Sequence, residues 1–208
     1  MTHVRWTALL VLISAIVLIL AISTGGSAAP RPQATPPAGQ DVPGPDECTI
    51  APRTLPLLAA TSAAPPATQQ TPFATPAGEP ASDEIARAIT ATVRESLACR
   101  NAGDFLRAYA LFSDRFLQER FSGEDAISPE LARALEETPV AVPVARQLAL
   151  IEISGIQLLA DERAGALVLT SNAEEAFADY LFFVRVDDRW LIDQVVFLSD
   201  TDLGTPAA

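Results

Sequence analysis

Apolar residues follow three different patterns along the chain. Residues 8–22 are apolar throughout apart from Ser14. Between residues 82 and 137, apolar residues recur every three or four positions, and from Gln147 to Leu198 they form short runs rich in β-branched and aromatic side chains. The helical spacing predicts amphipathic helices, and the later runs are typical of strands. The sequence therefore predicts helices followed by strands, as in α+β proteins.

The first predicted helix spans Ser82–Arg100. Ser82 is expected to cap it, and acidic residues fill the first turn, where the helix dipole favours negative charge. Asn101–Gly103 is expected to end this helix. Further helices are predicted at Phe105–Phe112 after a cap at Asp104, at Ser113–Phe121, and from Pro129 to about Glu137 after a cap at Ser128.

Four strands are predicted, at Gln147–Leu159, Ala164–Ser171, Tyr180–Val186 and Trp190–Leu198. Gly155 is expected to mark a bulge, residues 172–179 an acidic connector, and residues 187–189 a hairpin turn. Short connections between sequential strands favour antiparallel neighbours. The predicted fold is therefore α+β, with the helices packed on one face of a curved, four-stranded antiparallel sheet.

The N-terminal apolar segment predicts export. Residues 8–22 are short for a membrane-spanning helix, but residues 6–27 reach the required length of about 20 residues. Small residues at 26–29 would suit cleavage by signal peptidase, although Pro30 would hinder cleavage directly before it. Residues 1–29 are therefore an uncleaved signal anchor or a cleaved signal peptide. The rest of the chain is expected outside the cytoplasm, held by the cytoplasmic membrane or secreted.

Proline divides the exported part into segments. Thirteen of the 17 prolines lie between residues 30 and 80, so residues 30–81 are expected to form a disordered linker rich in Pro, Ala and Thr. An island at residues 47–58 interrupts this linker with Cys48 and several apolar residues, which could dock on the folded part or belong to the linker. The folded domain is expected at residues 82–200 and a disordered tail at 201–208.

Charge and composition exclude several classes of function. From Ala81 onward there are 11 arginines and 22 acidic residues, so this part carries 11 − 22 = −11. Such a field repels phosphate backbones, so we expect no nucleic-acid partner. The only histidine is His3, in the N-terminal segment. We therefore expect no histidine-based metal site, and no sequence motif calls for a metal or cofactor.

The two cysteines, Cys48 and Cys99, are expected to form a disulfide. An even cysteine count in an exported chain favours pairing. The bond would tie the island at residues 47–58 to the end of the first helix. The alternative is a buried, unpaired Cys99 with an exposed Cys48 that pairs between chains.

Three short segments resemble one superfamily. They are the Asn101-Ala102-Gly103-Asp104 turn, the Leu111-Phe112-Ser113-Asp114 segment and the closing strand at Trp190–Asp193. Together with a long first helix, they make residues 82–200 similar to the nuclear transport factor two-like, or polyketide cyclase-like, proteins. The resemblance implies a cystatin-like cone fold. Members include isomerases, dehydratases, cyclases and non-catalytic pocket or assembly domains.

The candidate site residues are Tyr109, Tyr180 and Asp193. Asp193 is expected to share a strand face with Leu191, Val195 and Phe197, where a carboxylate could act as a general base. A structural aspartate is the simpler interpretation, at the rim of the fold or paired with Arg185 across the hairpin.

The leading hypothesis is a non-enzymatic, membrane-anchored domain that binds a small apolar ligand or a protein partner. The alternatives are an isomerase, dehydratase or cyclase that uses Asp193 with a tyrosine, and a structural module that forms a homodimer.

Overall fold

The computed structural model describes residues 41–56, 74–122 and 126–198, all within a compact unit formed by Ala34–Ala208. A second unit, Met1–Gln33, lies outside these ranges, as do the apolar segment at 8–22 and the predicted tail at 201–208. Among the described residues, no helix combines the length and the apolar character that crossing a membrane requires.

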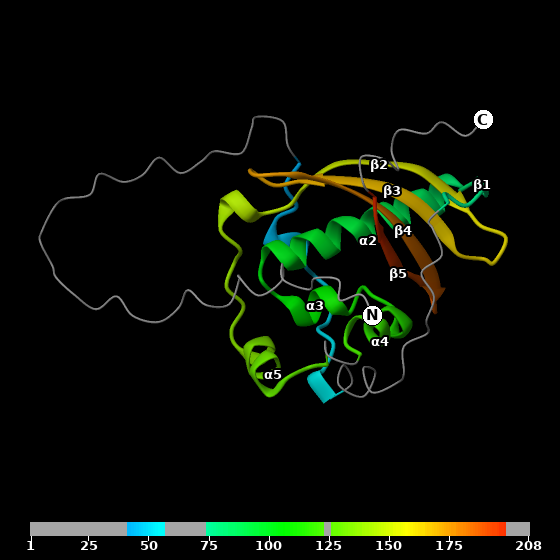
Figure 1. Ribbon diagram of the computed structural model, residues 1–208. Helices are drawn as coiled ribbons and strands as arrows, with labels where there is room; N and C mark the ends of the chain where they lie inside the picture. Colours follow the sequence, from blue (N-terminus) through cyan, green and yellow to red (C-terminus); the bar gives the residue numbers. More distant parts are fainter. Residues whose placement is uncertain (1–40, 57–73, 123–125, 199–208) are drawn as a thin grey trace, which may run out of the picture. The chain divides into compact units, whose positions relative to one another are not determined.

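Helices precede the main strands, as predicted (Figure 1). The α-helices are α2 (Asp83–Asn101), α3 (Phe105–Tyr109), α4 (Asp114–Arg120) and α5 (Pro129–Glu136), with short 3-10 turns η1 (Pro45–Glu47) and η3 (Val144–Arg146). The strands are β1 (Glu79–Pro80), β2 (Ala149–Leu158), β3 (Ala164–Ser171), β4 (Ala176–Val186) and β5 (Arg189–Phe197).

Each of these α-helices begins directly after a residue whose side chain caps its first turn. The side-chain oxygens of Ser82, Asp104, Ser113 and Ser128 each accept a hydrogen bond from the backbone N–H three residues later. These bonds satisfy donors that a helix leaves free at its first turn. All four predicted helix starts are thereby confirmed.

The second helix is shorter than predicted, ending at Tyr109 instead of Phe112. The next residues pair with a strand far along the chain. The Ile192 N–H donates to the Leu111 carbonyl at 2.9 Å, and the Ser113 N–H donates to the Ile192 carbonyl at 2.9 Å. This contact covers part of the edge of β5. No local sequence pattern predicts it.

Among the described residues the sheet has five antiparallel strands in chain order, so the prediction of four was wrong. The additional strand, β1, pairs Glu79 with Leu158 and Pro80 with Gln157. A two-residue strand ending in proline shows no alternation by which a sequence could reveal it. Strand β4 also begins at Ala176, four residues earlier than predicted, which shortens the acidic connector.

Three register shifts interrupt the described part of the sheet. Two lie in β2, one between Leu150 and Glu152 and one around Gly155, whose φ of +60° confirms the predicted bulge. The third lies in β5, where Phe183 pairs with Ile192 and Phe182 with Gln194, so that Asp193 has no partner opposite it. Asp193 is the extra residue of this bulge. It interrupts the alternation of side chains along β5, so the residues before it and those after it no longer follow one alternating pattern.

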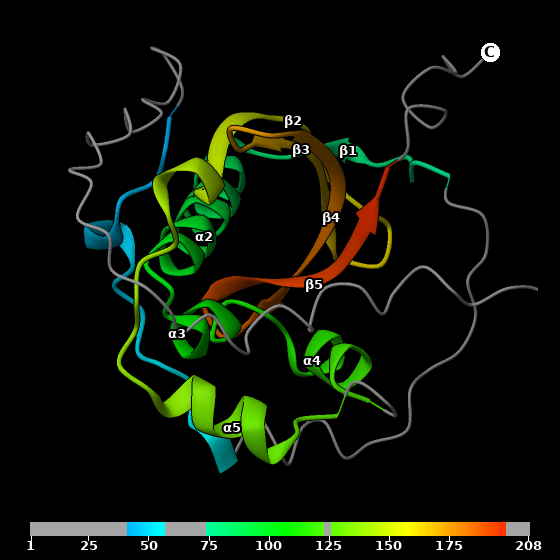
Figure 2. The same cartoon turned by 60° about the vertical axis from the view of Figure 1, so that its left-hand side comes forward.

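The sheet curves around α2, as Figure 2 shows. We call the face toward α2 the inner face and the opposite one the outer face. The inner core joins apolar residues of α2 to apolar residues of β3, β4 and β5: Ile89, Val93, Leu97, Ala164, Ala166, Val168, Leu181, Phe183, Trp190 and Ile192. Burying a large apolar side chain contributes about 1.5–3 kcal/mol, so this cluster is the main source of stability. A smaller cluster on the outer face contains Leu159, Tyr180 and Phe182.

Candidate functional site

The structure does not bring the three predicted site residues together. Tyr109 lies in α3 against the inner core, and Tyr180 belongs to the cluster on the outer face. Asp193 occupies the bulge of β5 beside the start of α4. Leu191 pairs opposite Val184, whereas Val195 lies opposite the inner-face residue Leu181. The expectation that Asp193 shares one face with Leu191 and Val195 was therefore wrong, because the bulge shifts the alternation.

Asp193 is buried and its carboxylate is fully engaged. Ser113 Oγ donates to Oδ1 at 2.6 Å, and the Arg115 guanidinium donates to both oxygens, with Nε at 3.1 Å from each and Nη2 at 2.5 Å from Oδ2. Arg115 Nη2 also donates to the Asp193 carbonyl at 2.7 Å. Such charge-assisted, forked contacts fix geometry strongly. Asp193 therefore joins the start of α4 to β5.

A second arginine approaches Asp193 from the β2–β3 turn. Arg163 Nη1 lies 3.8 Å from Oδ2, and the Arg163 guanidinium carbon lies 4.7 Å from the centre of the Phe182 ring. The expected partner, Arg185, lies instead near Asp188, at 3.4 Å. Pairing across the hairpin fails because Arg185 is opposite Trp190, three residues from Asp193.

Tyr180 is held tightly on the outer face. Its hydroxyl accepts a hydrogen bond from Gln157 Nε2 at 2.8 Å. A methyl group added at Gly165 would lie only 2.2 Å from the same hydroxyl oxygen. The ring of Tyr180 therefore requires a glycine on β3, and its role is packing between strands.

Tyr109 packs edge-on against Phe121, with ring centres 5.2 Å apart. Burial raises the pKa of the Tyr109 hydroxyl, and the charges of Arg120 and Arg100 partly oppose that shift. The phenol therefore remains neutral at physiological pH. It makes no hydrogen bond within the described part of the chain.

The sequence-based prediction missed Asp179. It lies on the inner face of β4, opposite Val168 on one side and Phe197 on the other. Its nearest neighbours along the same face of β4 are Phe177 and Leu181. The predicted strand began at Tyr180, which assigned Asp179 to a polar connector. A strand start at Ala176 places this carboxylate among apolar side chains.

Asp179 is half-buried and carries no hydrogen bond or ion pair within residues 41–56, 74–122 and 126–198. Burial raises the pKa of its carboxyl group, and the charge of Arg100 partly opposes this effect. Phe197 beside it is 80% exposed, so the inner face is open here. Asp179 is therefore an unpaired carboxylate in apolar surroundings that a partner can reach.

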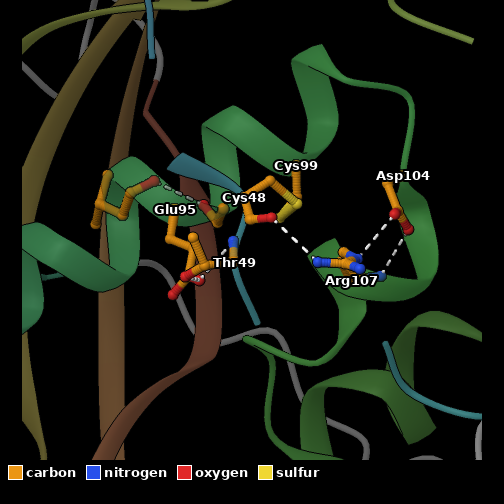
Figure 3. The surroundings of a disulfide bond; sticks show 8 residues. Cys48, Thr49, Glu95, Cys99, Asp104 and Arg107 are labelled. Atoms are coloured by element: carbon orange, nitrogen blue, oxygen red, sulfur yellow. Dashed lines mark hydrogen bonds and ion pairs between the residues drawn. A yellow bond between two sulfur atoms is a disulfide. The ribbon is translucent and has the colours of Figure 1, made fainter. Parts of the chain in front are cut away.

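The predicted disulfide is confirmed: Cys48 and Cys99 are bonded, with their Cα atoms 4.8 Å apart. Figure 3 shows this bond between the segment before the domain and α2. Arg107 Nη1 donates to the Cys48 carbonyl at 3.2 Å, and Thr49 donates to Glu95 from both its backbone and its hydroxyl. The part of the predicted island at 47–56 is thus docked, while Leu57 and Leu58 lie outside the described residues.

We call residues 41–56 the arm. Arg94 of α2 forms ion pairs with Asp41 and Glu47, and the hydrogen bond to Asp41 is the main cause that raises the Arg94 pKa. Further along the arm, Arg53 forms an ion pair with Asp114 at 2.7 Å. Arm backbone also contributes, because the Asp41 carbonyl accepts from the Leu150 N–H at 2.8 Å. The arm is therefore fixed to α2, to the region of α4 and to β2.

A shallow hollow of about 390 Å³ lies between the arm, α2 and β2, lined by Asp41, Thr90, Arg94 and residues 150–153. None of Tyr109, Asp179, Tyr180 or Asp193 lines it. Within the described ranges, no group of three or more His, Cys, Asp or Glu side chains is arranged to hold a metal ion. Comparisons with protein-family models, curated proteins and solved structures found no match to this chain.

Proposed function

We propose that this chain is a non-enzymatic binding domain, anchored in the membrane through its N-terminal apolar segment and joined to that segment outside the cytoplasm by the predicted proline-rich linker. The observation that carries the proposal is Asp179, an unpaired carboxylate at an open, apolar part of the inner face. A polar group left in such surroundings is stabilised when a partner supplies the missing contact.

Two further observations support parts of the proposal. The Cys48–Cys99 disulfide fits an oxidising compartment and hence an exported chain. The resemblance to the nuclear transport factor two-like superfamily, whose members include non-catalytic binding domains, agrees with the helices-then-strands order.

The alternative enzyme would use Asp193 with a tyrosine. The contacts of Asp193 with Ser113 and Arg115 argue against it, because a general base needs a free lone pair directed at its substrate. A homodimer is the other alternative, favoured by the exposed Phe197. Two domains that each carry about −11 would repel one another, so we favour a different partner.

Two measurements test the proposal. We expect no turnover of enolisable ketones by the full chain, and Asp193→Asn should leave that result unchanged. Turnover abolished by Asp193→Asn would refute the binding function. Native mass spectrometry of the full chain in detergent should give a monomer; a stable dimer would favour the structural module instead.

A further inference from the structure

We propose that Phe177, Asp179 and Phe197 form a docking surface for a basic side chain, lysine or arginine, presented by a protein partner. We call these three residues the Asp179 surface. The inference deepens the proposed binding function and rests on it. Its basis is the register of β4 and β5, which places the two rings and the carboxylate on the same face.

The carboxylate lacks a counterion within the chain's described residues. Arg100 is the cation whose charge bears on Asp179, yet no ion pair joins the two. Arg94 binds Asp41 and Glu47, and Arg115 binds Asp193, so neither of these arginines pairs with Asp179. An incoming cation would therefore meet an acceptor that no internal donor occupies.

The surroundings suit a cation carried on an aliphatic stem. The face of a phenyl ring attracts ammonium and guanidinium groups, and Phe177 and Phe197 both lie beside the carboxylate. The methylene stem of lysine or arginine can cover apolar surface while its charged end reaches an acid. A small anion or a purely apolar molecule would leave Asp179 unpaired.

A macromolecular partner fits better than a small molecule. Small-molecule sites are concave and enclose most of the ligand, whereas Phe197 is 80% exposed and the hollow beside Arg94 does not include the Asp179 surface. The charge of −11 carried from Ala81 onward attracts a basic protein and steers its approach. Arginine is enriched among the few residues that carry most of the binding energy at such interfaces.

The test uses the full chain in neutral detergent micelles and two synthetic peptides followed by NMR. One capped pentapeptide carries a central arginine between two leucines, and the other carries citrulline, which keeps the shape and loses the charge. We expect the arginine peptide to shift the amide signals of Phe177, Asp179 and Phe197 and to bind about tenfold more tightly than the citrulline peptide. Equal affinities would overturn the inference.

Four variants sharpen the test. Asp179→Asn, which keeps the shape, should weaken arginine-peptide binding about tenfold, and Phe197→Leu about two- to fivefold. Arg100→Gln should strengthen it, because a competing positive charge is removed. Glu152→Gln, at an exposed carboxylate on β2, should change nothing. Unchanged binding in Asp179→Asn, or equal losses in Asp179→Asn and Glu152→Gln, would refute the assignment.

A cross-linking measurement uses the absence of lysine from this chain. Carbodiimide activates a carboxylate, and a lysine amine then displaces the urea to leave an amide bond. With a lysine version of the peptide, every cross-link to an ε-amine must join the two molecules. We expect Asp179 as the main site; cross-links at exposed acids such as Asp188 alone would contradict the proposal. If Asp179 is not cross-linked while the chain shows no turnover and is monomeric, the Asp179 surface is refuted and the general binding function is retained.

Discussion

Breaking the Cys48–Cys99 bond should destabilise the domain by about 4 kcal/mol. The bond closes a ring across 51 residues of sequence, and the chain-entropy model assigns about 4 kcal/mol to a loop of that length. The ion pairs of the arm replace little of this, because partly exposed pairs contribute about 0–1 kcal/mol each. The arm therefore depends on the disulfide for most of its attachment.

Urea unfolding followed by circular dichroism measures this effect in Cys48→Ala. Cys48 is the better position to change, since Cys99 is fully buried and Cys99→Ala adds the cost of a cavity. The cavity should make Cys99→Ala less stable than Cys48→Ala. Wild-type protein treated with a reductant should match Cys48→Ala, because both lose only the cross-link.

A loss below about 1 kcal/mol in Cys48→Ala would refute the reasoning, since the chain-entropy model requires several times that value. Such a result would mean that the unfolded chain already keeps the arm close to α2. Limited proteolysis provides an independent check. Cleavage within residues 41–56 should accelerate in Cys48→Ala while the sheet stays intact.

Three further predictions concern the domain itself. Asp193→Asn should lower the free energy of unfolding by about 2 kcal/mol, because it breaks a buried charge-assisted pair, whereas Asp188→Asn at a fully exposed acid should have no measurable effect in the same urea titration. Gly155→Ala should cost about 1 kcal/mol for its positive φ, and Gly103→Ala about 1–3 kcal/mol more, because its added methyl would meet a backbone carbonyl at 2.1 Å. Asp179→Asn should stabilise the domain at neutral pH. Burial raises the folded pKa of Asp179 above its ordinary 3.8, so the folded state binds the proton more tightly than the unfolded state does. Wild-type stability is therefore lost as pH rises through the folded pKa. The gain in Asp179→Asn over wild type should therefore shrink as pH falls toward 3.8, and a gap that widens on acidification would contradict this sign.

Local chemistry made the helix starts predictable. A capping serine or aspartate acts on a backbone N–H only three residues away, so Ser82, Asp104, Ser113 and Ser128 can be recognised from sequence. The disulfide was predictable for a different reason, namely that two cysteines in a chain that is predicted to be exported have one possible internal pairing. Neither inference needed the tertiary fold.

Contacts between distant segments were not predictable. The pairing of Leu111 and Ser113 with Ile192 depends on how the domain closes, and so does the addition of β1 to β2. The bulge at Asp193 leaves no glycine or proline as a signal, yet it decides which face each neighbour occupies. Asp179 was missed because its place on the inner face depends on where β4 begins.

The central claim is a binding domain displayed outside the cytoplasm with its arm locked by a disulfide. Its most direct test is thiol labelling of intact cells or spheroplasts that contain the chain, with a membrane-impermeant maleimide applied before and after a membrane-impermeant reductant. We expect no label before reduction and label at Cys48 after it, whereas Cys99, which is fully buried, should be labelled only when the reduced chain is also unfolded with urea. Label that appears without reduction, or only after the membrane is broken, would contradict the account.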